Sequence, residues 1–525
     1  MNKRTTYNGS TLTQDLTLDA DVVIVGTGAG GGMTAEILTQ AGLKVVMLEK
    51  GGYHTAKNFS QNEAEAFPML YMDAGAQRTK DKGMVVLQGR SVGGGTTVNW
   101  TTSFRTPDFT LKFWEDQYGL KGFNSAAMAP HFAAVEQRLN MHTWSDAPPN
   151  ENNALLARGC EKLGFKSAII KRNVKACANS GLCGVGCPIN AKQGMLVTTI
   201  PSALDQGATL VYCAEAITIQ HDGKRTTGVE ALAMDPLGQT PTGRKIRVNA
   251  KHVVLAAGAI RSPALLMRSK VPDPSGKLGK RTFLHPVAVT LARMEEPVNA
   301  FHGAPHSVYS EHYMLHEGKV NGTARMGYKL EALPVTPLLM ASLVDKSFGP
   351  ASAELMKALP HWHGIDALHR DGFNDHEACG TVELSGDTGV VLDYPITDFV
   401  KKSLVSATIE LAEIQFAAGA QQVMPMHMEA TPLKNLNEVR QWTQTASMDP
   451  LRLLGGSAHV MGGCQMGTST SNSVVNEWGR HHTIENLSVI DGSVFPTSIG
   501  LNPQLSIYAT AHKNAHALVK ALKGA

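Results

Sequence analysis

The sequence lacks any run of about 18 or more apolar residues, so no stretch of it is long enough to span a membrane as a helix. It also lacks a strong excess of either charge, because 48 Lys and Arg against 45 Asp and Glu leave a net charge of +3 that is spread along the chain. Nucleic acid binding needs a concentrated basic stripe. We therefore expect no transmembrane segment and no nucleic acid partner.

The amino-terminal stretch before the first expected strand has two early basic residues but no apolar segment and no small-residue cleavage site. It therefore carries no recognisable export signal. The cytoplasm is the default location that we expect, and export together with a signal-bearing partner stays open.

Length and composition indicate a globular enzyme. Hydrophobic residues at 43%, charged residues at 18% and 51 glycines are typical of a soluble protein with many tight turns. At 525 residues the chain is too long for one ordinary core, and it suits two closely connected domains of unequal size.

A nucleotide-binding pattern begins near the amino terminus. Residues 21–26 are expected to form a short buried strand, residues 27–42 a helix that begins at glycines, and residues 43–51 a second strand. The turn holds a G-x-G-x-x-G motif, which lets the backbone approach a pyrophosphate at the positive end of the helix; its glycines are Gly26, Gly28 and Gly31. Glu49 ends the second strand, where an acidic residue binds ribose hydroxyls. The pattern predicts a dinucleotide, and both NAD and FAD satisfy it.

Two later segments bring further glycines and polar groups to such a site. Residues 89–107, GRSVGGGTTVNWTTSFRTP, combine a glycine run that includes Gly94 with Asn99, whose amide is both a donor and an acceptor. Residues 252–271 run from a strand through Gly258 into a helix, which fits a second close approach of the backbone to a cofactor.

The carboxyl-terminal segment, residues 486–522, is the most informative. It combines a buried strand, the turn residues Asp491 and Gly492, the pair Asn502 and Pro503, and a helix that begins at Gln504. The positive end of that helix is suited to stabilise negative charge that builds on a flavin ring during reduction.

These segments resemble the signatures of the glucose-methanol-choline (GMC) family of FAD-dependent oxidoreductases. The resemblance implies an α/β (α+β) fold with a Rossmann-like FAD-binding domain from residues 15–290 and 452–525, and a smaller substrate-binding domain from residues 291–451, built on a mixed or antiparallel sheet with helices. It implies contacts to FAD from Gly26, Gly28, Gly31, Glu49, Gly94, Asn99, Gly258, Asp491, Gly492, Asn502 and Pro503. Val98 stands where covalent members carry a linking histidine, so we expect dissociable FAD.

The catalytic residues follow from the same resemblance. Among twenty histidines, His459 lies in GGSAHVMGGCQMG, which is similar to the family's H-x-x-G-T-C-x-M-G element, with Gly463 in place of the usual threonine. Alcohol oxidation needs a hydride acceptor and a base near the hydroxyl, and histidine suits the base. The family's partner residue matches Asn502, whose amide would hold the substrate oxygen while His459 accepts the proton.

Seven cysteines form an odd count, and three of them crowd into eleven residues, which indicates a local site rather than a disulfide framework. Cys177, Cys183 and Cys187 lie in a loop over residues 172–200 that resembles the long-chain alcohol oxidase and dehydrogenase branch, and also bacterial sugar dehydrogenases in which such cysteines bind an iron-sulfur cluster. Three thiolates could ligate a cluster. A folded loop of reduced or disulfide-linked cysteines is the alternative.

The branch resemblance implies a primary alcohol of medium or long chain as the substrate, oxidised to its aldehyde, with oxygen, a quinone or a redox protein as the electron acceptor. Met- and Leu-rich stretches such as TPLLMASLV and MPMHM fit either a packed core or an apolar substrate channel. The alternatives are a sugar or polyol dehydrogenase with an iron-sulfur relay and a lyase on the same fold.

Overall fold

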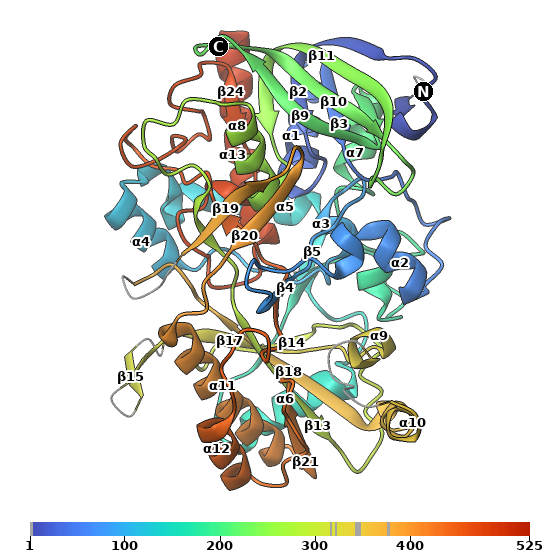
Figure 1. Ribbon diagram of the computed structural model, residues 1–525, viewed down its shortest axis with the longest axis vertical. Coiled ribbons are helices and arrows are strands. Elements are labelled where there is room, and N and C mark those ends of the chain that lie inside the picture. Colours follow the sequence, from blue (N-terminus) through green and yellow to red (C-terminus); the bar gives the residue numbers. More distant parts are fainter. Residues whose placement is uncertain (1–3, 316–317, 321–322, 342–347, 375–378, 525) are drawn as a thin grey trace.

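The protein is described by a computed structural model that covers residues 4–315, 318–320, 323–341, 348–374 and 379–524. Figure 1 shows two layered bodies stacked along the longest axis, each built on its own eight-stranded sheet. Both termini lie at the same end, on the first body. The predicted mixture of helices and sheets is confirmed.

The first sheet has the strand order β1-β8-β3-β2-β11-β10-β9, and β24 pairs with the second half of β11. The strands from β1 to β11 and β24 run parallel, whereas β10 and β9 are antiparallel additions. The bounds are β1 (Thr5–Asn8), β2 (Leu16–Val25), β3 (Val45–Glu49), β8 (Thr209–Tyr212), β9 (Ala214–His221), β10 (Thr226–Met234), β11 (Pro241–Leu255) and β24 (Leu487–Val489). The expected strand-helix-strand unit is confirmed, with α1 (Ala29–Gln40) between β2 and β3.

Helices cover this parallel sheet because its strands are apolar on both faces. Helix α1 packs against β2, β3 and the carboxyl-terminal helix α13 (Gln504–Lys523), whose predicted start at Gln504 is confirmed. The other helices of this body are α2 (Glu63–Leu70), α3 (Gly95–Val98), α4 (Asp108–Tyr118), α5 (Ser125–Arg138), α7 (Thr199–Asp205) and α8 (Gly258–Arg268).

The second sheet has the order β4-β22-β13-β18-β17-β14-β6, and β21 also pairs with β13. Its central pairs are antiparallel, and β4 joins β22 in parallel. The bounds are β4 (Met84–Val86), β6 (Ala168–Ile169), β13 (Val287–Arg293), β14 (Val308–Ser310), β17 (Tyr328–Ala332), β18 (Trp362–His369), β21 (Gln422–Pro425) and β22 (Gly455–Ser457). Strands from well outside residues 291–451 therefore complete this sheet, and the exact domain boundaries stay a prediction.

The helices on the second sheet are α6 (Glu151–Lys162), α9 (Pro337–Leu339), α10 (Pro350–Lys357), α11 (Asp398–Ala417) and α12 (Leu436–Thr445). Helix α11 packs across β13 and against α6, as Figure 1 shows in the lower body. A smaller antiparallel sheet of β12 (Lys280–Phe283), β19 (Gly380–Ser385), β20 (Gly389–Asp393) and β23 (Met461–Gly462) links the bodies. Two ribbons, β5 (Met141–Thr143) with β7 (Lys171–Asn173) and β15 (Gly318–Val320) with β16 (Thr323–Arg325), complete the strands.

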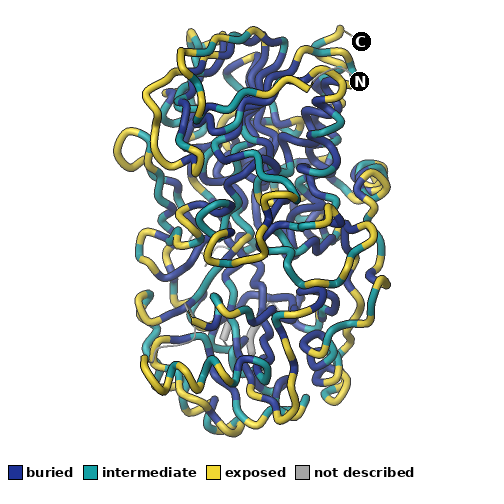
Figure 2. The backbone as a smooth tube through the Cα atoms, turned by 90° about the vertical axis from the view of Figure 1, so that its right-hand side faces the viewer, coloured by how far each residue is buried: buried dark blue, intermediate teal, exposed yellow. Residues whose placement is uncertain are grey.

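Each body has its own apolar core. One large cluster surrounds the first sheet, and two others lie on the second sheet and under α11. Figure 2 shows buried backbone running through the interior of both bodies, with exposed segments at the outer turns. Both sheets are therefore held rigidly, and the space where they meet is framed by well-packed walls.

Candidate active site

A cavity of about 940 Å³ lies where the two bodies meet. Its walls include residues of the nucleotide turn after β2, the start of α8, the segment before α13, and strands β13, β17, β18 and β22. This volume is at the upper end of the range for small-molecule sites, so the cavity has room for a large cofactor. Of the predicted site residues it is lined by Gly26, Gly28, Glu49, Gly94, Asn99, Gly258, His459, Asp491, Gly492, Asn502 and Pro503.

The glycines after β2 are required by close backbone contacts. Gly26 has a φ of +98°, and a Cβ there would lie 2.3 Å from the carbonyl oxygen of Ala256. Gly31 does not line the cavity, and a Cβ on it would lie 1.9 Å from the oxygen of Gly26. Gly31 therefore allows α1 to pack on the turn, while Gly26 and Gly28 keep the cavity wall free of side chains.

The second glycine loop faces the first one across this wall. Gly94 has a φ of +53°, and a Cβ there would lie 2.8 Å from the Cα of Gly28. Asn99 follows α3, and its Nδ2 donates to Gln504 Oε1 at 2.7 Å, whereas its buried Oδ1 has no hydrogen-bond partner in the structure. A cradle free of Cβ atoms and a buried acceptor on the wall of the cavity are the features that bound FAD requires. The residues present therefore fit this cofactor.

Two predicted acidic contacts have partners within the protein. Glu49 accepts from the Thr27 backbone N–H at 3.1 Å and the Gly51 backbone N–H at 2.9 Å, and burial raises the pKa of its carboxyl group. Asp491 accepts from the Gly258 N–H at 2.9 Å, which joins the turn after β24 to the start of α8. Both carboxyl groups thus fix the shape of the cavity wall, and their contacts to FAD stay a prediction.

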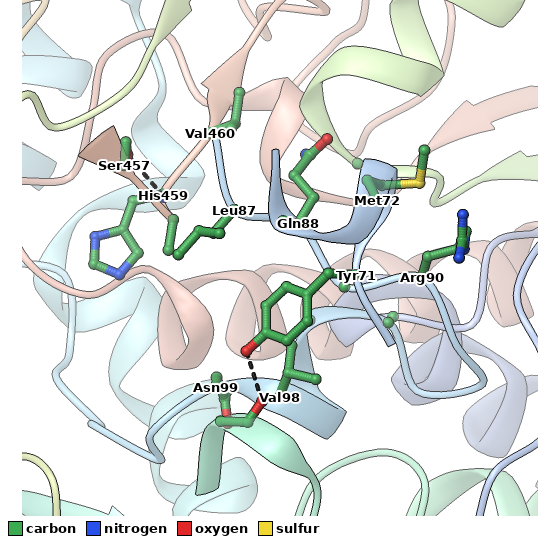
Figure 3. A pocket seen from close by; sticks show the side chains of 18 of the residues that line it. Tyr71, Met72, Leu87, Gln88, Arg90, Val98, Asn99, Ser457, His459 and Val460 are labelled. Atoms are coloured by element: carbon green, nitrogen blue, oxygen red, sulfur yellow. Dashed lines mark hydrogen bonds between the residues drawn. The ribbon is translucent and has the colours of Figure 1, made fainter. Parts of the chain in front are cut away.

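His459 follows β22 and lies half-buried among the side chains that line the cavity in Figure 3, near Leu87. Its backbone N–H donates to Ser457 Oγ at 3.0 Å. Burial lowers the pKa of the imidazole to about 3, so the ring is neutral at ordinary pH.

The ring of His459 contacts a second histidine that the sequence did not reveal. His285 Nδ1 lies 3.3 Å from His459 Nδ1, and His285 Nε2 accepts from the Gly500 backbone N–H at 3.1 Å. Burial lowers the pKa of His285 well below its usual value, so this ring is also neutral. Since its Nε2 is an acceptor, the hydrogen of neutral His285 is on Nδ1, which faces the ring of His459. The contact with His285 therefore orients the ring of His459 at the cavity wall, and its predicted role as base stays a prediction.

Asn502 is held by a buried ion pair on β17. Its Oδ1 accepts from Lys329 Nζ, and its Nδ2 donates to Glu331 Oε2 at 3.0 Å. Only one N–H of the amide is used by Glu331, so the other can reach a ligand in the cavity. The amide orientation is thereby fixed, as its predicted role at a substrate oxygen requires.

Sequence comparison identifies the family. Models described as GMC oxidoreductase match residues 67–287 and 376–511, and a model described as FAD binding domain matches residues 19–63. A long-chain-alcohol oxidase of Arabidopsis thaliana is 30% identical over 534 residues, which covers 97% of this chain and 70% of that protein. The chain belongs to the GMC oxidoreductase family. It is an FAD-dependent oxidoreductase, as the resemblance implied.

Other relatives agree with this assignment. An uncharacterised GMC-type oxidoreductase of Sinorhizobium fredii is 30% identical over 97% of this chain and 96% of its own length. Among solved structures, pyridoxine 4-oxidase from Mesorbium loti has a TM-score of 0.70 at 17% identity and covers 95% of this GMC oxidoreductase and 98% of its own chain. Formate oxidase of Aspergillus oryzae has a TM-score of 0.70 at 14% identity, covering 97% and 99%. At these identities the structures show the shared fold alone.

One part of the cavity of this GMC oxidoreductase carries charge. Glu331 on β17 pairs across the strands with Asp366 on β18, and His306 precedes β14. Burial raises the pKa of the Asp366 carboxyl group well above its usual value. Burial would also raise the pKa of Glu331, but His306, Lys329 and the hydrogen bond from Asn502 together lower it. The pKa values of the two carboxyl groups are therefore shifted in opposite directions. These residues were not predicted from the sequence, although Lys329 and Glu331, two apart in the short strand YKLEA, were a signal for them.

Another part of the wall is apolar. It includes Pro337, Leu338 and Leu339 from α9, and Met426 after β21. The Met- and Leu-rich stretches singled out in the sequence thus contribute to the cavity, while residues 342–344 of the first stretch lie outside the described residues. An alkyl chain would find an apolar surface here.

The cysteine loop reaches the cavity through Gly181, Leu182, Gly184 and Val185, but its three cysteines do not line it. Cys177, Cys183 and Cys187 are unpaired. Within the part of the chain that the structure describes, one set of three metal-ligating side chains has its ligand atoms within 4.8 Å of one another, and this set is His306, Glu331 and Asp366 rather than the cysteines. The iron-sulfur cluster stays a prediction of the sequence.

Among the described residues of the GMC oxidoreductase, no helix combines the length and apolar character that crossing a bilayer demands.

Proposed function

We propose that this GMC oxidoreductase oxidises a primary alcohol of medium or long chain to the corresponding aldehyde. The observation that carries the proposal is that His459 and Asn502 share one cavity with the FAD-binding glycines and with the apolar wall at α9. The relatives named long-chain-alcohol oxidases support the same substrate class. Bound FAD supplies the acceptor for the hydride that leaves the carbinol carbon.

The protein's own residues bind and orient the alcohol. Asn502 is fixed by Lys329 and Glu331, and His459 by His285, so two polar groups from different bodies are held rigidly at the wall of the cavity. Such fixed groups align the hydroxyl without the entropic cost of ordering them during the reaction. The buried walls also exclude water.

A polyol is the second candidate substrate. The buried carboxyl groups of Glu331 and Asp366 and the buried imidazole of His306, on the same cavity wall, favour a molecule with several hydroxyl groups. Oxygen, a quinone or a redox protein then takes the electrons, and the relatives named oxidases favour oxygen.

The test is anaerobic reduction of the purified holoenzyme, followed by flavin absorbance. We expect 1-dodecanol to bleach the flavin faster than 1-butanol at equal concentration, because burial of each additional methylene on the apolar wall adds about 0.8 kcal/mol. Bleaching by sorbitol or glucose but not by 1-dodecanol would establish the polyol alternative. An unchanged spectrum with every alcohol would contradict the proposed function. Readmission of air to the reduced enzyme then shows whether oxygen is an acceptor.

A further inference from the structure

A smaller cavity of about 40 Å³ adjoins the large one beside strand β13. Five residues line both cavities, so the two share one stretch of wall, formed by Val287, Val289, Met426, Leu454 and Gly455. A cavity needs about 10–15 Å³ to hold one water molecule. The smaller cavity therefore has room for a few heavy atoms, and the proposed function described above gives it no role.

The strand pairing at the edge of β13 explains why the two cavities meet there. Strand β22 pairs with β13 at Val287, whereas strand β21 pairs with the same edge from Thr290 to Arg293. Met426 follows the end of β21, and Leu454 precedes the start of β22. These two residues therefore lie where one edge partner of β13 gives way to the other, and they form part of the shared wall.

The remaining wall of the smaller cavity comes largely from two helices. Leu404 and Thr408 belong to α11, and Trp442 and Thr443 belong to α12. Helix α11 packs against β13, β21 and α12, and Figure 1 shows this group of elements in the lower body. The smaller cavity thus extends the large one into the second body, away from the nucleotide turn after β2.

The hydroxyl and imidazole side chains on the wall of the smaller cavity have their hydrogen bonds within the protein. Thr408 and Thr443 each donate from Oγ1 to a carbonyl oxygen of the preceding helical turn, at 2.9 Å in both cases. The two ring nitrogens of His427 bond to backbone groups at 2.7 and 3.0 Å. A hydroxyl group placed here would lose its hydrogen bonds to water, whereas an alkyl group has none to lose. The smaller cavity therefore suits an alkyl group.

The two ends of the apolar wall of the large cavity differ in charge. At the α9 end, Glu63 also lines the cavity, and its Oε2 accepts from the Leu338 backbone N–H at 2.9 Å. An alkyl chain there would cover part of a carboxyl group, which costs free energy. At the other end lies Met426, whose unbranched side chain adapts readily to a neighbouring group. The end at Met426, where the smaller cavity begins, is therefore the better direction for an alkyl chain.

We propose that the alkyl tail of the alcohol extends past Met426 into the smaller cavity, and that Thr408 and Thr443 limit the length of tail that is bound. This proposal rests on the proposed function, because it names the part of the site that selects long-chain alcohols. Each methylene that leaves water for this cavity should increase binding by about fourfold. A short alcohol does not reach it and gains nothing.

The first test does not depend on turnover. The bromine atom of ω-bromododecanol quenches the fluorescence of a tryptophan that it contacts, and Trp442 lines the smaller cavity. With chemically reduced holoenzyme, which cannot accept a hydride, we expect this alcohol to remove more emission from the wild type than from Trp442→Phe. The short ω-bromobutanol should remove the same amount from both proteins. Equal quenching of both proteins by ω-bromododecanol would overturn the proposal.

The second test compares two threonines of α12. Thr443 lines the smaller cavity and Thr445 is exposed, while each donates from Oγ1 to the carbonyl oxygen three residues earlier. We expect Thr443→Phe, which fills the cavity, to lower the ratio of anaerobic flavin reduction rates for 1-dodecanol and 1-butanol by about 10-fold. Thr445→Phe should leave this ratio within about twofold. Thr408→Phe fills the same cavity from α11 and should act as Thr443→Phe does.

The outcomes separate this proposal from the proposed function. An unchanged ratio in Thr443→Phe and Thr408→Phe with FAD bound normally, or an equal fall in Thr445→Phe, would overturn the role of the smaller cavity and leave the proposed function intact. Failure of every alcohol to reduce the wild type would instead contradict the proposed function. The quenching of Trp442 would then still decide whether an alkyl chain enters the smaller cavity.

Discussion

Lys329 Nζ lies 2.9 Å from Glu331 Oε1, two residues along the same strand, and neither side chain reaches solvent. Removing one partner of such a buried pair leaves the other charge uncompensated. We therefore expect Lys329→Met to lower the free energy of unfolding by about 3–5 kcal/mol in urea titrations.

The exposed pair of Lys112 and Asp116, 2.9 Å apart on α4, is the control, and Lys112→Met should leave the free energy of unfolding nearly unchanged. The double variant Lys329→Met/Glu331→Gln should recover much of the loss. Equal effects of the two lysine substitutions would contradict the assignment of a buried charge pair.

Buried neutral histidines are expected to make the protein sensitive to acid. Burial lowers the pKa of His252 and His363 to about 3 and that of His369 to about 4. The pKa of histidine in the unfolded chain is about 6.5, so below this pH the unfolded chain binds protons that the folded protein does not. The contribution of these histidines to the free energy of unfolding is therefore fully present above about pH 6.5 and is lost as the pH falls. At about pH 5.5 each such histidine should lower the free energy of unfolding by about 1.4 kcal/mol relative to its value above about pH 6.5.

Urea unfolding at about pH 7.5 and 5.5 measures this difference in the free energy of unfolding. His363→Gln should make the difference smaller by about the contribution of one histidine. The same stability at both pH values would show that these rings are accessible to protons in the folded state.

Gly94 is expected to control FAD binding. Gly94→Ala would place a Cβ 2.8 Å from the Cα of Gly28, in a backbone with a φ of +53°, so the two glycine loops must separate. We expect the bound FAD per protein, from the absorbance ratio at the flavin and protein bands, to fall by about 10-fold or more, which corresponds to about 1.4 kcal/mol of cofactor affinity.

Gly42→Ala separates this collision from backbone strain alone. Gly42 also has a positive φ, +80°, but no atom lies within 4 Å of its Cβ position. The Gly42 variant should be slightly less stable and retain its FAD. Similar FAD loss in both variants would exclude the close contact with Gly28 as the cause.

Asn502→Asp tests the amide that Lys329 and Glu331 orient. The substitution replaces the Nδ2 donor, 3.0 Å from Glu331 Oε2, by a second carboxylate oxygen. Two carboxyl groups so close share a proton, and the pKa of the pair rises above its unfolded value. The folded variant then binds more protons than the unfolded chain. Its loss of stability relative to wild type should therefore grow as pH rises from about 5 to 8. Asn502→Ala should also be less stable than wild type, but by an amount that does not change with pH. Thermal unfolding of both variants across this pH range is the measurement.

The parts of the site that were predictable are local in sequence. The turn with Gly26, Gly28 and Gly31 needs only the residues between β2 and α1, because a strand, a tight turn and a helix must follow one another in a fixed order. The helix from Gln504 has a clear start after Pro503 for the same reason.

The residues that escaped prediction owe their roles to distant strands. His285 meets His459 across 174 residues, and His306 meets Glu331 because β14 and β17 pair in one sheet. A lone histidine in an apolar segment has no spacing that marks it as functional. The tautomer of His285 depends on the Gly500 backbone N–H, which no side-chain pattern reveals.

The parallel pairing of β2 with β11 joins Leu16 to Ile246, and that of β11 with β24 joins Val253 to Leu487. Such non-local pairing gives a high contact order, and closure of these long loops slows folding. A growing chain on the ribosome cannot complete the first sheet until its last strand has emerged. Apolar edges remain exposed during that interval, so chaperone assistance and a low expression temperature should raise the yield of folded, FAD-binding enzyme.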